Sequence, residues 1–566
     1  MLYPIIVLGL IAVLMVLVFF HHQNTLKKQT AKLKAFWGKP KEEYINFNKV
    51  RRYTNLSHLS QHHELSEQTM NDIDFDRLFT FLDRTTSKIG QQYLYDRLRK
   101  PLFSKQELQQ FDTQCNFFSS NLEARITAQL ELGKLGSEQN YSVVSLLNKN
   151  LPEAPRWFSW LYVDLSILVA SFILSFKWPL FIILGILTAA FNVFYLNYLN
   201  KRNVLQFNNS LPQLDLLIRC AKGMSKMNLP FDRGQIQEST SVFKYLQRLI
   251  NVIYFGYELK GQENLAYAPL YLFDIIKSIL LVESFTLYGL LNSIKKNQDK
   301  IQTLFSYVGL IDCAVATASL RSGSLETCIP VFTAEKKFLH IEEGIHPLID
   351  NCVGNSIEIR QKSVLLTGSN MSGKSTFLRM LSINALLSQT LYTCFAKKYT
   401  ASMMSLYSSV RIDDNLFQGK SYFFQEVNVM STLIDAVDRE GQNLYILDEI
   451  FKGTNTIERI ASAKALLSFL DQKDHIIFVS THDIELINLL EAEYELYHFT
   501  ETVKDEKLYF DHMIKPGPLK SRNAIKILEL MHFPDKIIRE ANELSKIMLG
   551  RSDKNDFMNS INASKY

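Results

Sequence analysis

This chain of 566 residues has no cysteine motif, no strong net charge and no marked compositional bias. Its six cysteines are scattered without C-x-x-C or Cys/His spacing, which argues against a zinc site or a disulfide framework and fits a reducing compartment. The net charge of +5 is mild and by itself predicts neither a nucleic-acid binder nor a membrane-surface protein. Inspection finds no short repeats or low-complexity segments. Any functional inference must therefore come from local patterns.

The length allows two or three domains, and hydrophobic residues make up 47% of the chain, concentrated in a few runs. The first run covers residues 3–20, carries no charge and is followed by six lysines up to position 41. About 18 apolar residues can just span a bilayer. Because the lysines follow the run and no small-x-small cleavage site appears, we expect an uncleaved anchor rather than a signal peptide, with the chain after it in the cytoplasm.

Two further apolar runs, residues 157–176 and 178–198, are separated by a short turn and have aromatic residues near their ends. They predict a transmembrane hairpin, which makes three spans in all. Asp164 lies inside the first of these runs, so a hairpin buried in a soluble core is the alternative. A fourth apolar stretch, residues 265–294, carries three charged residues, and we expect it to be a long helix of a helical core rather than a span.

The strongest signal lies at residues 367–376, which contain G-x-x-x-x-G-K-[ST]. An apolar strand-like run, residues 363–367, leads into this loop, and a helix-like run, residues 377–387, follows it. Glycines let the backbone curl so that its N–H groups and the following helix N-terminus hold phosphate oxygens. A chance Gly/Ser turn is the simpler explanation, but the strand–loop–helix context favours a nucleotide site. The predicted nucleotide-binding residues are Gly368, Ser369, Asn370, Met371, Ser372, Gly373, Lys374, Ser375 and Thr376.

Within this loop, Lys374 is predicted to reach the β- and γ-phosphates and Ser375 to bind Mg²⁺. Downstream, the apolar strand at residues 443–447 ends in Asp448 and Glu449. Considered by itself, this segment would be interpreted as a surface strand that ends in acidic residues. Together with the nucleotide loop, it predicts that Asp448 is a second metal ligand and that Glu449 activates water. A further strand, residues 476–480, leads to His482, which could sense the γ-phosphate although a lone histidine is more often a satisfied polar group.

These segments resemble the ATPase domain of the MutS family of DNA mismatch-repair proteins. Residues 367–376 resemble T-G-P-N-M-x-G-K-S-T, with Ser369 in place of the usual proline, and residues 448–456 resemble D-E-I-G-R-G-T-S-T. Three shorter segments also resemble motifs of this family. Residues 480–486 resemble T-H-x-x-E-L, and residues 344–347 resemble G-R-H-P. Residues 419–426 resemble G-x-S-T-F-x-x-E, with Tyr422 in place of threonine. Upstream, residues 82–102 are similar to the L-D-x-T…G…P-L that begins the helical core, and Ile311-Asp312 falls in a helix resembling the core's return to the ATPase.

The resemblance covers about residues 72–545 and implies Mg²⁺-dependent ATP hydrolysis with Glu449 and His482 as catalytic residues. It also implies a homodimer through the ATPase domains, in which Ser421 contacts the nucleotide of the other subunit, and association with double-stranded DNA. Two departures bear on function. Only about 50 residues separate the first run from the core motif, too few for a mismatch-reading domain, and the apolar hairpin interrupts the helical core. A membrane-tethered ABC-like mechanochemical ATPase without DNA contact is therefore the alternative.

The predicted fold is a C-terminal α/β ABC-like P-loop ATPase domain preceded by an all-α MutS-type core that a transmembrane hairpin interrupts. We expect an inner-membrane, multi-pass protein with its ATPase domain in the cytoplasm. The expected parts are an anchor (1–22), a linker (23–71), the first part of the core (72–155), the hairpin (156–200), the second part of the core (201–330), the ATPase domain (331–548) and a flexible tail (549–566).

Overall fold

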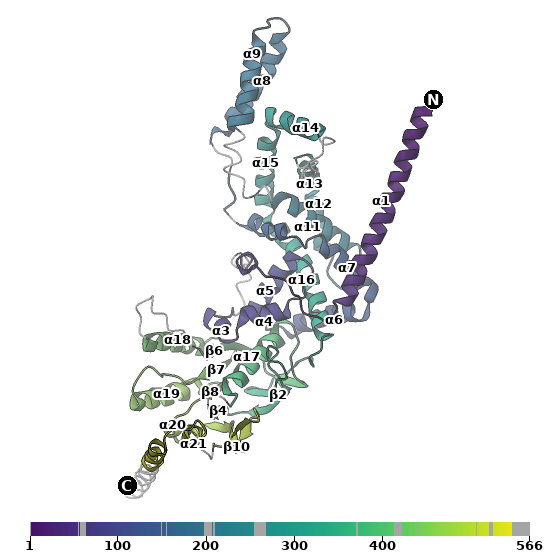
Figure 1. Ribbon diagram of the computed structural model, residues 1–566. Coiled ribbons are helices and arrows are strands. Elements are labelled where there is room, and N and C mark those ends of the chain that lie inside the picture. Colours follow the sequence, from purple (N-terminus) through teal and green to yellow (C-terminus); the bar gives the residue numbers. More distant parts are fainter. Residues whose placement is uncertain are drawn as a thin grey trace. The chain divides into compact units, whose positions relative to one another are not determined.

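The computed structural model describes residues 2–54, 56, 64–148, 150–153, 156–196, 207, 210–253, 268–369, 372–411, 422–439, 441–504, 507–519 and 524–545 (Figure 1). The chain divides into two compact units. Unit 1 comprises residues 1–62 and 79–324, and unit 2 comprises residues 63–78 and 325–566. Unit 1 is helical, while unit 2 contains the β-sheets, so the predicted combination of a helical part and a C-terminal α/β part is confirmed.

Unit 1 is built around α16 (Gln298–Arg321), which packs against α5 (Lys88–Arg99), α6 (Lys105–Ser120), α11 (Ser210–Ser225) and α12 (Gly234–Val242). Within the described ranges, α16 is the one helix both long and apolar enough to cross a membrane, but 83% of its most apolar stretch is buried inside the protein. It is therefore a core helix, and it contains the predicted Ile311-Asp312 pair. Among its described residues, unit 1 also contains α1 (Leu2–Ala35), α2 (Phe47–Val50), α7 (Leu122–Gly133), η1 (Glu138–Leu147), η2 (Arg156–Ser159), α8 (Trp160–Ser175), α9 (Phe181–Phe191), η3 (Asn192–Leu196), α13 (Lys244–Ile253), α14 (Ala268–Ile279) and α15 (Val282–Lys296).

The two apolar runs predicted as a hairpin form α8 and α9, which pack against each other (Figure 1). Both helices are shorter than the predicted runs, and residues 197 and 198 at the end of the second run lie outside the described residues. The described apolar side chains are mostly exposed, with Phe176 at 82% and Leu180 at 79%. In α8 only Leu161 and Ser171 are buried, and in α9 no residue is. A hairpin buried in a soluble core does not fit this exposure.

The predicted single long helix over residues 265–294 is wrong, because the chain turns between α14 and α15. Leu281, at the turn, adopts a left-handed backbone with φ of 52° and is fully buried. A leucine in this conformation is strained and persists only where its surroundings hold it. Packing of the Leu281 side chain against Leu161 supplies such a hold.

Unit 2 contains a sheet of six strands in the order β12-β9-β4-β8-β7-β6, in which β9, β4, β8, β7 and β6 run parallel. A second sheet has the order β1-β5-β2-β3, and β10 and β11 form a hairpin. The strands are β1 (Val331–Phe332), β2 (Phe338–Gly344), β3 (Asn355–Arg360), β4 (Ser363–Thr367), β5 (Lys398–Ala401), β6 (Met404–Ser409), β7 (Gln442–Asp448), β8 (Ile476–Ser480), β9 (Tyr494–His498), β10 (Glu501–Lys504), β11 (Lys507–Phe510) and β12 (Lys515–Pro516).

Helices cover both faces of the six-stranded sheet, as its buried central strands require. On one face, Ile477 and Val479 of β8 join a core with α18 (Tyr422–Val437), α19 (Thr456–Leu470) and α20 (Ile484–Leu490). Because side chains alternate along a strand, Phe478 points to the other face, where it contacts Phe377 of α17 (Lys374–Thr390). This layered arrangement places the ends of β4, β7 and β8 beside the start of α17. Further along the chain, unit 2 also contains α21 (Ala524–Leu530).

Residues 63–78 group with unit 2, although the sequence divided them between a linker and the first part of the core. They contain α3 (Glu67–Asp72), whereas α4 (Phe75–Leu82) crosses the division between the units. The buried Asp72 carboxylate accepts hydrogen bonds from Ser408 Oγ at 2.6 Å, Arg411 N at 2.8 Å and Val410 N at 3.0 Å. These bonds tie α3 to the end of β6. Burial nevertheless raises the pKa of Asp72.

Candidate active site

The loop that joins β4 to α17 has the backbone that its glycines predict. Gly368 and Gly373 have φ of 142° and 115°, a region that side chains disfavour. Between them, Ser372 Oγ donates to Ser369 O at 2.7 Å, and Ser369 Oγ donates to Glu501 Oε2 at 2.9 Å. Asn370 and Met371, also predicted to bind nucleotide, lie outside the described residues.

Lys374 opens α17 and is only 2% exposed. Its ammonium donates to two carbonyl oxygens of the loop, Gly368 O at 2.5 Å and Ser369 O at 3.0 Å, and lies 3.4 Å from His482 Nε2. Burial lowers the pKa of Lys374, while Asp448 and Glu449 oppose that effect. The site therefore holds a desolvated cation at the mouth of the loop.

The two predicted metal ligands meet directly. Ser375 Oγ donates to Asp448 Oδ2 at 2.7 Å, across the gap between the start of α17 and the end of β7. The other carboxylate oxygen of Asp448 accepts a hydrogen bond from Ser480 Oγ at the end of β8. Asp448 is thus oriented from both sides by neighbouring elements.

Glu449 follows in a left-handed conformation with φ of 48°, and its N–H donates to Ser480 O at 3.0 Å. Its Oε1 lies 2.9 Å from His482 Nε2, and its Oε2 lies 2.8 Å from Lys452 Nζ. The pKa of Glu449 is lowered to about 2. The hydrogen bond with His482 is the largest cause. Burial acts in the opposite direction, and Lys452 lowers the pKa further. Glu449 is therefore an ionised carboxylate between two cationic or donor groups.

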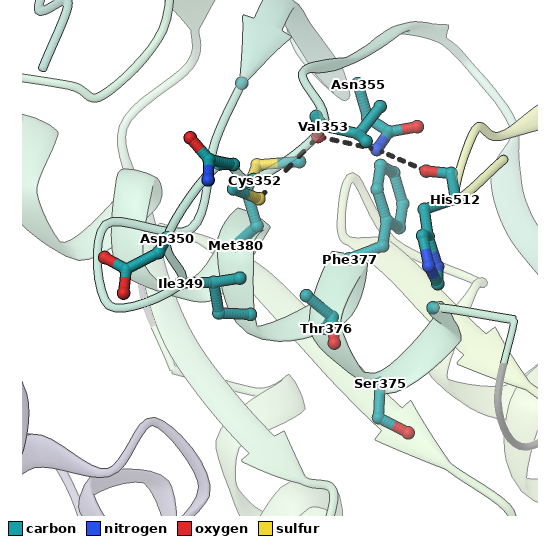
Figure 2. A pocket seen from close by; sticks show the side chains of 13 residues that line it. Ile349, Asp350, Cys352, Val353, Asn355, Ser375, Thr376, Phe377, Met380 and His512 are labelled. Atoms are coloured by element: carbon teal, nitrogen blue, oxygen red, sulfur yellow. Dashed lines mark hydrogen bonds between the residues drawn. The ribbon is translucent and has the colours of Figure 1, made fainter. Parts of the chain in front are cut away.

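A cavity of about 370 Å³ opens beside the start of α17 (Figure 2). Ser375, Thr376, Phe377 and Met380 line it from α17, and residues 349–353 line it from the segment before β3. His512 completes the wall, with its ring 5.8 Å from that of Phe510. Asn355 fixes the His512 segment, because its Nδ2 donates to His512 O at 3.0 Å and its Oδ1 accepts from Ile514 N at 2.8 Å. The cavity is contiguous with the loop, since Gly373 and Ser375 belong to both.

The structure thus brings together Lys374, Ser375, Asp448, Glu449 and His482, while Thr376 lies at the cavity. Their chemical roles stay predictions. Ser421, predicted to act on the partner's nucleotide, lies outside the described residues.

Sequence reasoning assigned no role to two residues that the structure places near the site. His512 lies far along the chain from the loop and has no local motif that could have signalled it. Glu426, on α18, is buried and accepts hydrogen bonds from the backbone N–H groups of Lys452 and Gly453. Its position at the end of the 419–426 motif could have indicated a role for it.

Comparison with known proteins finds a match to the family model "MutS domain V" over residues 364–548. DNA mismatch repair protein MutS of Natronomonas pharaonis is 28% identical over 270 residues, which cover 46% of this chain and 30% of the relative. MutS of a Thermus thermophilus strain is 30% identical over 220 residues, 38% of this chain and 27% of the relative. MutS of Lactobacillus gasseri is 30% identical over 271 residues, 45% of this chain and 31% of the relative. The matches span about a third of the length of these curated relatives.

Proposed function

We propose that this chain, which belongs to the MutS family, binds ATP with Mg²⁺ at the loop between β4 and α17 and hydrolyses it. One observation carries the proposal. Groups from α17, from the end of β7 and from the segment after β8 converge within hydrogen-bonding distance around this loop. The chemistry of these groups is that of phosphate binding, metal binding and water activation.

The Ser375 hydroxyl and the Asp448 carboxylate fit Mg²⁺, because both are hard oxygen donors and their atoms already meet at 2.7 Å. When bound, the ion would neutralise charge on the phosphate oxygens. Among the residues that the structure describes, no group of three acidic, histidine or cysteine ligands exists. Such a sparse protein set suits Mg²⁺, which keeps several waters and takes phosphate ligands. Lys374 supplies the fixed positive charge for the β- and γ-phosphates.

Glu449 is the group that accepts a proton from the attacking water. Its lowered pKa of about 2 keeps it ionised at neutral pH, and His482 orients its Oε1. The cavity next to Thr376 takes the base and ribose, with His512 offering a ring for stacking. Thus phosphates, metal and base all lie along the start of α17.

Equilibrium binding of ATP to the purified protein tests this assignment. Lys374→Ala should weaken binding at least about ten-fold, because a buried charge-assisted contact to phosphate is lost. Lys336→Ala removes an exposed lysine that pairs with Asp474 and serves as the matched control, with unchanged affinity. Equal affinities for wild type and a folded Lys374→Ala would contradict a nucleotide site at this loop.

The apolar hairpin of α8 and α9 favours a membrane location. Its described side chains are exposed, and an apolar surface of this kind is stable in lipid. We propose that the hairpin and the N-terminal part of α1 insert into the inner membrane, with the nucleotide site in the cytoplasm. Residues 13–20 of α1 include exposed apolar side chains in keeping with this placement.

Two roles for ATP turnover follow. The relatives are DNA mismatch repair proteins by name, which supports a role on DNA. For that role we propose double-stranded DNA as the partner and a homodimer as the active form. The exposed hairpin supports instead a membrane-tethered mechanochemical ATPase that acts on protein or lipid. Duplex DNA binding by the detergent-solubilised protein separates them, because phosphate contacts give an affinity that falls steeply with salt. An absence of salt-dependent binding would leave the second role.

A further inference from the structure

A buried carboxylate on α18 reaches the segment that follows Glu449. Glu426 is 1% exposed, and its Oε1 and Oε2 accept the N–H groups of Lys452 and Gly453, each at 3.0 Å. Two successive amides donating to one carboxylate make a strong, directional contact. Glu426 therefore holds the backbone of residues 452–453 in a fixed place relative to α18.

Close packing reinforces this contact. A Cβ added to Gly453 would lie 2.8 Å from Phe423 Cβ, so only glycine fits there. The Phe451 ring packs 6.4 Å from the Phe423 ring, although Phe451 has a left-handed backbone with φ of 60°. A phenylalanine keeps such a conformation only where its surroundings impose it. The first turns of α18 thus contact and constrain residues 451–453.

The proposed catalytic carboxylate, Glu449, lies just before these residues. Lys452, whose N–H is held by Glu426, places its ammonium 2.8 Å from Glu449 Oε2. Glu449 N is fixed in turn by Ser480 O at 3.0 Å. Any shift of the Lys452 backbone would therefore move a partner of Glu449. By contrast, none of the described hydrogen bonds joins Glu426 to Lys374, Ser375 or Asp448.

We propose that Glu426 is a positioning residue for hydrolysis, which links α18 to Glu449 through the backbone of Lys452 and Gly453. This inference rests on the proposed function and extends it, since it assigns to α18 control over the catalytic carboxylate and not over nucleotide affinity. A movement of α18 would then change turnover at an unchanged ATP affinity.

Hydrogen exchange tests the contact without any nucleotide. In Glu426→Gln, the side-chain NH₂ faces one of the two amides, so one acceptor is lost while the volume is kept. Peptides covering residues 450–454 should exchange at least about ten-fold faster than in wild type. Asp435→Asn changes an exposed carboxylate on the same helix and should leave exchange unchanged. Wild-type exchange in a folded Glu426→Gln would overturn the inference.

Kinetics test the role. Glu426→Gln should lower kcat about ten- to a hundred-fold, the cost of a misplaced catalytic group, with the KM for ATP within two-fold of wild type. In a Glu449→Gln background, the same change should lower kcat less than two-fold, because residues that act as a unit are not additive. Equal losses in both backgrounds, or a rise in KM that matches the fall in kcat/KM, would overturn the positioning role. A wild-type protein that binds ATP and never hydrolyses it would overturn the proposed function, and this inference with it.

Discussion

Both carboxylate oxygens of Glu449 have a partner, His482 at Oε1 and Lys452 at Oε2. The pKa of about 2 that results lies below the ordinary value of 4.5. A carboxylate with a lowered pKa stays charged down to that lower value, so protonation of Glu449 should not limit turnover at any pH from 5 to 8. At the residue scale, His482 is thus predicted to keep Glu449 ionised at acid pH.

Replacing His482 tests this point. The His482 hydrogen bond is the largest cause of the lowered Glu449 pKa, so His482→Asn should let that pKa rise toward 4.5. The fall of kcat on the acid side should therefore move to higher pH, and it becomes visible in profiles measured from pH 4.5 to 8. Profiles of wild type and His482→Asn that superimpose after scaling would show that His482 does not govern Glu449.

At the scale of single elements, runs of buried apolar residues were predictable. The strands expected at residues 363–367 and 476–480 are β4 and β8, and the strand expected at 443–447 lies within β7. These strands are central and covered on both faces, so their sequences are continuously apolar and bounded by polar residues. The helix after the loop was also predicted. It starts at Lys374, earlier than expected, because Gly373 is its N-cap residue.

Features that depend on distant contacts were not predictable. The turn at Leu281 carries no glycine or proline, and packing rather than local preference sets it. His512 reaches the cavity wall only because Asn355, far away in the sequence, binds its segment. Residues 63–78 join unit 2 through hydrogen bonds from β6 to Asp72, and no local pattern encodes such a pairing.

The hairpin of α8 and α9 makes a prediction at the same scale. Lys177, in the turn between the two helices, should be the far-side end of the hairpin, since the lysines after the first run place the following chain inside. In a cysteine-free background, Lys177→Cys should react with a membrane-impermeant thiol reagent in intact cells, and Lys336→Cys in unit 2 should react only after lysis. Labelling of both positions before lysis, or recovery of the protein in the soluble fraction, would contradict the insertion.

For the whole molecule, the described residues of the candidate site all belong to unit 2, whereas the exposed hairpin belongs to unit 1. Nucleotide chemistry is accordingly expected of unit 2, and under the proposed membrane insertion the hairpin of unit 1 would determine where that chemistry acts. The sequence could place the ATPase-like part toward the C-terminus, where the family model matches residues 364–548, because the nucleotide motifs are local and specific. It could not predict the boundary between the units, which depends on long-range contacts.

The central claim is that Glu449 activates water for ATP hydrolysis in a site assembled for nucleotide binding. Steady-state Mg²⁺-dependent ATP hydrolysis by Glu449→Gln, measured together with ATP binding, tests it most directly. Turnover should fall about 10²–10⁴-fold, the usual contribution of a general base, while ATP affinity stays within a few-fold of wild type. Glu458→Gln, an exposed glutamate on α19, is the matched control and should keep wild-type turnover. Near-wild-type hydrolysis by a folded Glu449→Gln would contradict the account.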